Sequence, residues 1–109
     1  MNTYQCPLSS NIIEIKIEND VAYFENSNID ERHIKLFVLL LSDCINDLKK
    51  KNITKIIQNV DQDSWELYLS ANPKWNLLRI DPYSGAYIIE CSIDSALENI
   101  VSGFGFVCQ

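Results

Sequence analysis

Residues Asn28–Lys51 read NIDERHIKLFVLLLSDCINDLKKK, and this segment is the strongest indication of the architecture. Apolar residues recur in it at helical spacing, so they form one stripe when the chain turns once every 3.6 residues. The stripe consists of Ile34, Phe37, Val38, Leu41, Ile45 and Leu48. The spacing therefore predicts one long helix with a face that packs on a sheet.

Polar residues mark both ends of this helix. Asn28, followed three positions later by Glu31, approximates an N-terminal capping box. Asn52 tolerates the left-handed conformation that ends many helices. Lysines 49–51 stand at the C-terminal end, where positive charge complements the helix dipole. We therefore assign the lysines to helix stability rather than to phosphate binding.

Three further leucines of the helix, Leu36, Leu39 and Leu40, point away from this stripe. A helix that is apolar over most of its girth needs cover on two sides. An uncovered leucine forfeits about 1–2 kcal/mol at 25 cal/mol per Å² of apolar surface. These three residues are therefore predicted to form an interface for self-association or for a protein partner, with Phe104 and Phe106 as secondary anchors.

A strand pair is predicted before the helix. Residues 11–17 alternate between apolar and charged side chains, and residues 21–25 return after the polar turn Glu18-Asn19-Asp20. After the helix, Ile53–Val60 reads as a buried strand, and strand, helix and strand in succession favour a right-handed parallel crossover. The face of the sheet that carries Glu14 and Lys16 is expected to stay partly open.

The second half of the chain predicts a hairpin and a last helix. Residues 65–71 fit either a strand or a short helix, and the following Asn72-Pro73 favours the helix. Residues 74–80 and 86–91 read as strands around the turn Asp81-Pro82-Tyr83-Ser84-Gly85. A helix follows and ends near Gly103.

These elements predict an α+β fold. The sheet is mixed and mainly antiparallel, has four or five strands, and carries two helices on one face. The order is strand, strand, helix, strand, short helix, strand, strand, helix. With 109 residues, we expect a loose lead-in over 1–10 and a single domain over 11–109.

Composition excludes several classes of function. Fifteen acidic residues against nine basic ones give a net charge of −6, which disfavours nucleic acid as a partner. The longest apolar run, residues 36–41, is too short to cross a membrane. Four cysteines without a CxxC pair and one histidine predict no metal site, and we expect no cofactor. Free thiols and the lack of a signal peptide predict a cytoplasmic protein. Ile, Asn and Lys together supply 33 residues, a bias that indicates an AT-rich genome.

Asp61, Asp63 and Ser64 follow the predicted central strand, at the edge where open sheets bind ligands. Two carboxylates beside a hydroxyl could hold a cation or a phosphorylated serine. The alternative is a turn in which Asp and Ser cap a helix. His33 reads as a surface residue, and Cys91 reads as a buried thiol or, alternatively, as a nucleophile at a helix N-terminus.

The order of the elements resembles STAS domains, the fold of anti-sigma-factor antagonists. The hairpin 12–25, the crossover helix, the strand 53–60 and the pair Asp63-Ser64 carry this resemblance, together with Ser92-Ile93-Asp94-Ser95-Ala96-Leu97. The resemblance implies that Ser64 is a phosphoacceptor. Trp65 and Glu66 depart from the small residues that the family has after its serine.

The sequence therefore predicts a protein-interaction or regulatory module without catalysis, and not an enzyme. Its partner would be another protein or a second copy in a homodimer, with no nucleic acid and no membrane. The alternative is a STAS-like phospho-switch, or a binder of a small ligand or cation, centred on Asp61, Asp63 and Ser64.

Overall fold

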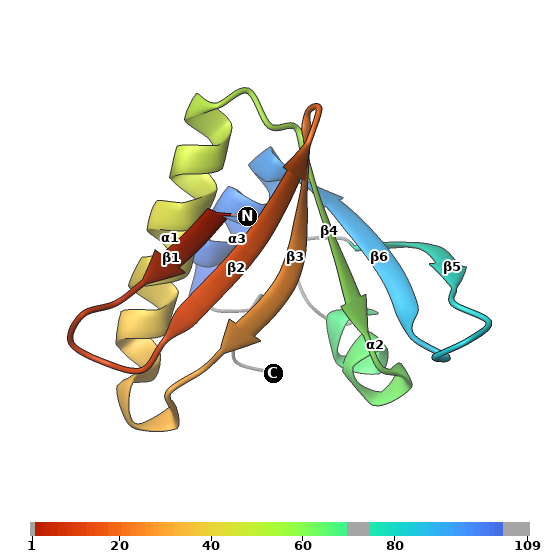
Figure 1. The fold of residues 1–109 in the computed structure, drawn as a ribbon, viewed down its shortest axis with the longest axis horizontal. Helices are drawn as coiled ribbons and strands as arrows, with labels where there is room; N and C mark the ends of the chain where they lie inside the picture. Colours follow the sequence, from red (N-terminus) through yellow and green to blue (C-terminus); the bar gives the residue numbers. More distant parts are fainter. Residues whose placement is uncertain (1, 70–74, 104–109) are drawn as a thin grey trace.

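The structure, a computed structural model, describes residues 2–69 and 75–103, with the side chains of 64, 67–69 and 99–103 outside the description. Six strands form one mixed sheet in the spatial order β1-β2-β3-β4-β6-β5 (Figure 1). The strands are β1 (Asn2–Gln5), β2 (Ile12–Glu18), β3 (Val21–Asn28), β4 (Lys55–Val60), β5 (Asn76–Ile80) and β6 (Tyr87–Ser92). The predicted α+β class with a mixed, mainly antiparallel sheet is confirmed.

The helices follow the predicted order. The short 3-10 turn η1 (Glu31–His33) leads into α1 (Ile34–Lys50), and α2 (Gln62–Leu69) and α3 (Ile93–Gly103) follow later. The helix α1 connects β3 to β4, and these two strands are parallel while the other neighbouring pairs are antiparallel. The helices α1 and α3 pack against each other behind the sheet (Figure 1).

One apolar core lies between α1, α3 and the sheet. The buried residues of α1 recur at helical spacing: Phe37, Val38, Leu41, Cys44, Ile45 and Leu48. Opposite them, Ile13, Ile15, Ala22, Ile56 and Ile89 of four strands are fully buried. This stripe is the predicted one except at Ile34, which is 39% exposed in the first turn, while Cys44 is buried.

The first ten residues differ from the expected loose lead-in. Residues 2–5 form the edge strand β1, which pairs antiparallel with β2 from Asn2↔Ile15 to Gln5↔Ile12. The Tyr4 hydroxyl donates a hydrogen bond to the Asp47 carboxylate on α1. Burial, and then this hydrogen bond, raise the pKa of Tyr4. Long-range pairing therefore creates a strand that the local sequence does not signal.

Turn and cap residues match the sequence pattern with one exception. Positive φ angles occur at Asn19 (57°) and Asn52 (63°), as expected for a hairpin turn and a helix terminator, and at Gly85 (73°). The capping residue, however, is Asp30 rather than Asn28, because the Asp30 carboxylate accepts from the backbone N–H of Arg32. The ambiguous segment after β4 is the helix α2.

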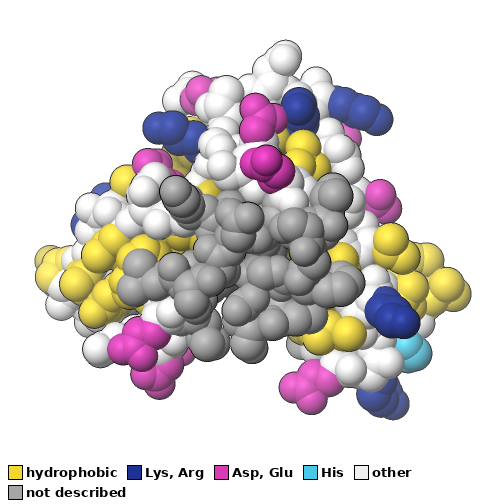
Figure 2. Space-filling model, turned by 180° about the vertical axis from the view of Figure 1, so that it is seen from behind, with side chains coloured by type: hydrophobic (Ala, Val, Ile, Leu, Met, Phe, Trp, Pro, Cys, Tyr) yellow, Lys and Arg dark blue, Asp and Glu magenta, His cyan; other side chains and the backbone are white. Residues whose placement is uncertain are grey.

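The apolar surface of α1 is narrower than the sequence predicts. Leu39 is 61% exposed, but Leu36 is half-buried and Leu40 packs against the core. Figure 2, which views the molecule from behind, shows hydrophobic side chains on both flanks of that side. Phe104 and Phe106 lie outside the described residues. An interface at these positions stays a prediction.

The packing of α1 makes a test of the fold. Replacing Ile45, which is fully buried, with alanine should lower the free energy of unfolding by about 2–5 kcal/mol, because it leaves a cavity in the core. The matched variant Leu39→Ala, on the exposed side of the same helix, should change it by less than about 0.5 kcal/mol. Urea denaturation measures both, and equal losses would contradict the assigned helix face.

Candidate functional site

The sheet is open at one place, between the parallel strands β3 and β4. Their pairing runs only from Val21↔Lys55 to Phe24↔Gln58. Beyond this point β3 continues along β2 to Asn28, and β4 continues along β6 to Val60. In Figure 1 the two strands start side by side and diverge toward their carboxyl ends. Backbone groups on the inner edges of both strands are therefore left without a neighbouring strand.

A β-bulge in β3 explains this divergence. Ile15 of β2 pairs with Phe24, and the preceding Glu14 pairs with Asn26, so Glu25 is an extra residue without a partner. A bulge bends the strand that carries it and increases its twist. The bulge falls directly after the last residue of β3 that pairs with β4. Bulges of this kind often lie next to active sites, where they redirect a side chain.

The gap between the two strands contains a hollow of about 300 Å³. Its lining residues Ile57 and Ile88 alternate with the core residues Ile56 and Ile89 and so face away from α1, whereas Phe24 packs against the core and Gln58 stands in register with Ile89. Its lining residues are Tyr23, Phe24, Glu25, Ile57, Gln58, Asn59, Arg79, Asp81 and Ile88. A smaller hollow of about 120 Å³ continues along residues 24–27 and is lined by Glu25 and Gln58 as well.

Two polar side chains of the gap have no hydrogen-bonding role among the described residues. The Nε2 atom of Gln58 is buried and has no hydrogen-bond partner there. An unsatisfied buried donor costs about 1–3 kcal/mol, so a ligand with a carbonyl oxygen would relieve this cost. The carboxylate of Glu25 lines both hollows and forms no ion pair within the described chain. The gap thus offers an amide and a carboxylate to a ligand.

Asp81 also lines the hollow, but its carboxylate belongs to the β5–β6 turn. It accepts hydrogen bonds from the Tyr83 backbone N–H (3.0 Å) and from the Ser84 hydroxyl (2.9 Å). These bonds lower the pKa of Asp81, with Tyr83 as the main cause. Asp81 therefore stabilises the turn, whereas Arg79 and Tyr23 line the hollow with a cationic and a hydroxyl group.

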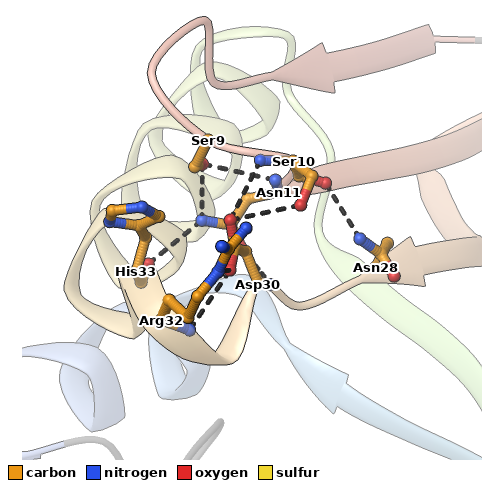
Figure 3. Close-up of polar contacts among 7 residues, drawn as sticks. All are labelled: Ser9, Ser10, Asn11, Asn28, Asp30, Arg32 and His33. Carbon is orange, nitrogen blue, oxygen red and sulfur yellow. Dashed lines mark hydrogen bonds and ion pairs between the residues drawn. The ribbon is translucent and has the colours of Figure 1, made fainter.

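A polar cluster surrounds Asp30 at the carboxyl end of β3, before α1 begins (Figure 3). The Asp30 carboxylate accepts from the backbone N–H groups of Arg32 (3.1 Å) and Ser10 (3.3 Å) and from the Ser10 hydroxyl (3.2 Å). The side chain of Asn11, which is fully buried, accepts from the Asp30 N–H (2.6 Å) and donates to the His33 carbonyl (3.1 Å). The pKa of Asp30 is lowered, and the N–H of Ser10 is the largest cause.

The ligand site predicted from the sequence is placed at the carboxyl end of β4. Asp61 follows β4 and Asp63 lies in the first turn of α2, and both are exposed. Ser64 is part of α2, and its side chain lies outside the description. Among the described residues no group of three or more His, Cys, Asp or Glu side chains could hold a metal ion.

The other residues considered for catalysis, His33 and Cys91, lie outside the gap between β3 and β4. His33 is exposed in η1, as expected for a surface residue. Cys91 is 2% exposed, and burial raises its pKa to about 12, as burial also does for Cys44. Glu25 and Gln58, which line the gap, were not recognised in the sequence. The sequence gives little signal for them, because Glu25 is followed by the polar residues 26–28 and Gln58 is followed by Asn59.

No protein-family model and no curated protein matches this sequence. The fold does resemble solved N-acetyltransferases. The PaiA N-acetyltransferase of Thermoplasma acidophilum, solved in complex with coenzyme A, has a TM-score of 0.58 at 20% identity, over 75% of this chain and 52% of that one. The ribosomal-protein-S18-alanine N-acetyltransferase of Escherichia coli has a TM-score of 0.56 at 20% identity, over 76% and 61%. The chain thus spans 52% and 61% of these two structures, and identities this low show the fold alone.

This likeness corrects three expectations. The resemblance to STAS domains is wrong, because the structures that share this fold are N-acetyltransferases. With it falls the reading of Ser64 as a phosphoacceptor in a STAS-like switch. The expectation of a regulatory module without catalysis is overturned by the same finding, since those structures are enzymes.

Within the described part of the chain, no helix is long and apolar enough to cross a membrane.

The hydrogen bonds to the Asp30 carboxylate make the stability of the folded protein depend on pH. Because the folded pKa of Asp30 is below its ordinary value of 3.8, its contribution is present above that pH and is lost as the pH falls through the folded pKa. Asp30→Asn should therefore reduce the drop in melting temperature between about pH 5 and pH 2. Asp43→Asn, at an exposed position of α1, should leave that drop as in the wild type. An unchanged drop in Asp30→Asn would refute this role.

Burial also predicts which thiols react. At neutral pH, iodoacetamide should label Cys6, which is partly exposed, well before Cys44 and Cys91, whose thiols stay protonated. Peptide mass spectrometry after timed labelling assigns each site, and labelling of the urea-unfolded chain is the control. Fast native labelling of Cys91 would instead support a nucleophilic thiol.

Proposed function

We propose that this chain is an N-acyltransferase that moves an acyl group from a thioester to an amine in the gap between β3 and β4. The observation that carries the proposal is the early end of β3–β4 pairing at the Glu25 bulge, which opens a hollow with unpaired strand edges. Its fold is that of N-acetyltransferases, and one of those structures is a complex with coenzyme A.

The gap suits the arm of such a donor. The pantetheine arm of coenzyme A is a linear chain with two amides that ends in the thiol. A chain of this kind can hydrogen-bond to the free edges of two strands as a further strand would. The amide of Gln58, buried beside Phe24 and Glu25, supplies a donor for one of its carbonyl oxygens. In this proposal the arm lies along these residues, and the thioester at its end lies near the bulge.

The side chains around the bulge suit the transfer. Glu25 accepts the proton that the amine loses as its nitrogen bonds to the thioester carbonyl carbon. The carbon–sulfur bond then breaks, and the sulfur takes a proton, for which the Tyr23 hydroxyl in the same hollow is the candidate donor. The products are an amide and a free thiol. Asp61 and Asp63, exposed carboxylates that follow the carboxyl end of β4, favour an acceptor that arrives as an ammonium ion.

A cytoplasmic location belongs to the proposal as well. Its support is that Cys6, Cys44 and Cys91 are free thiols in the structure.

Glu25 is the position at which the proposal is tested. Glu25→Gln removes the proton acceptor but keeps the size of the side chain, so it should slow thioester aminolysis by at least about 100-fold. Glu18→Gln, at the far end of β2 from the gap, is the matched control and should keep the wild-type rate. The assay follows loss of thioester absorbance with a panel of small amines, and mass spectrometry identifies the acylated product.

Two outcomes of this assay would contradict the proposal. One is a wild-type protein, folded by circular dichroism, that consumes neither acetyl-coenzyme A nor S-acetylpantetheine faster than buffer does with any amine. The other is turnover that is equal in the wild type and in Glu25→Gln, since the transfer would then not occur at the bulge.

A further inference from the structure

The hollow between β3 and β4 carries two opposite charges that no ion pair of the described chain neutralises. Glu25 lies on β3 and Arg79 lies on β5, and both line the hollow. Neither side chain forms an ion pair with another described residue. The proposed transfer uses Glu25 as a proton acceptor, but it gives Arg79 no role.

A second β-bulge places Arg79 on the face of the sheet that carries the hollow. Arg79 pairs with Ile88, which lines the hollow, because Leu78 is an extra residue in β5. Without this extra residue Arg79 would stand opposite Tyr87, which packs against the core, since a slip of one residue moves a side chain to the other face. The bulge therefore turns the guanidinium toward the hollow, as the bulge at Glu25 does for a carboxylate.

The strand register places the two charges at one level of the sheet. Asn59 of β4 and Arg79 of β5 both pair with Ile88 of β6. Glu25 directly follows the β3 residue that pairs with Gln58, so it lies level with Asn59. The carboxylate and the guanidinium are therefore on opposite sides of the hollow, with the apolar side chain of Ile88 between them.

Asp81, which also lines the hollow, does not occupy the donors of Arg79. Its carboxylate is hydrogen-bonded within the β5–β6 turn and makes no ion pair with Arg79. The Tyr83 N–H, and then the Ser84 hydroxyl, lower the pKa of Asp81 more than Arg79 does. The guanidinium thus keeps N–H donors for a ligand, in the fork geometry that matches a carboxylate.

The charges around Arg79 favour a carboxylate over a phosphate. Glu25 and Asp81 line the same hollow, so one cation stands there with two carboxylates. A singly charged anion can bind beside this cation, whereas a doubly charged phosphate would meet stronger repulsion from both carboxylates. The net charge of −6 acts in the same direction.

We infer that the acceptor is an amino carboxylate, with its amine at Glu25 and its carboxylate bound by the guanidinium of Arg79. This inference rests on the proposed function and deepens it, because it names the chemical class of the amine that is acylated. The ammonium of the acceptor first releases one proton to water, and the amine then loses a second proton to Glu25 as it is acylated. The carboxylate stays an anion throughout, so Arg79 determines specificity and takes no part in the covalent steps.

The test compares amino carboxylates with their own amides, which keep the amine but lack the negative charge. Alanine, β-alanine and 4-aminobutanoate cover three spacings between the two groups, and acetyl-coenzyme A is the donor throughout. For at least one of the three, kcat/KM should exceed that of its amide by at least about tenfold, because charge-assisted hydrogen bonds hold the carboxylate. O-Phosphoethanolamine should be a poorer acceptor than this amino carboxylate.

Variants of Arg79 provide a second readout, the ratio of kcat/KM between the preferred amino carboxylate and its amide. Arg79→Gln should lower this ratio by at least about tenfold, and Arg79→Lys, which keeps the charge but loses the fork, should give a ratio between those of the wild type and Arg79→Gln. Lys35→Gln, which removes an exposed cation of α1, is the matched control and should keep the wild-type ratio. Circular dichroism confirms that each variant is folded, and the wild-type comparison decides the matter where Arg79→Gln does not fold.

The outcomes separate this inference from the proposed function. Acylation of the amides or of O-phosphoethanolamine at least as fast as of the amino carboxylates overturns the inference and leaves the proposed function standing. An unchanged ratio in folded Arg79→Gln does the same. Acylation of no amine at all by the wild-type protein overturns both.

Discussion

The parallel pairing of β3 with β4 covers four residues and determines how the two halves of the sheet are joined. It is long enough to join two groups of strands, β1-β2-β3 and β4-β6-β5, into one sheet. It is too short to keep them together to the end. What holds the two groups together is the crossover helix α1, whose apolar face covers residues from both, such as Ile15 and Ile56. The helix therefore joins the two groups of strands through the core, although their hydrogen-bonded pairing ends at Phe24 and Gln58.

The bulge at Glu25 connects this architecture to chemistry. One additional residue in β3 bends the strand away from β4 and at the same time turns a carboxylate toward the gap. The cost of the opening is a set of unpaired backbone edges and the buried amide of Gln58, for which the described chain supplies no partner. Such a cost is ordinary at a site whose ligand completes the missing bonds.

Sequence reasoning identified the elements with strong periodicity or specific turn chemistry. The stripe of α1, the positive φ at Asn19 and Asn52, and the parallel crossover were predicted, because each depends on local spacing and handedness. Strand β1 was missed, because Asn2–Gln5 has almost no apolar pattern and exists through pairing with β2. The gap was missed for a similar reason. A bulge is defined by the register between two strands, and the residue pattern of one strand does not reveal that register.

The prediction that three leucines outside the main stripe lie uncovered has a physical explanation. A count of apolar positions on one helix treats every residue outside the main stripe as uncovered, although Leu40 packs onto the core. Apolar excess is a weak guide to function, because more than half of an ordinary protein surface is apolar. Unpaired backbone is a stronger one, because nearly all buried N–H and C=O groups in proteins have partners. In this chain the edges of β3 and β4 beyond their pairing lack a neighbouring strand, and the buried Nε2 of Gln58 beside them has no partner among the described residues.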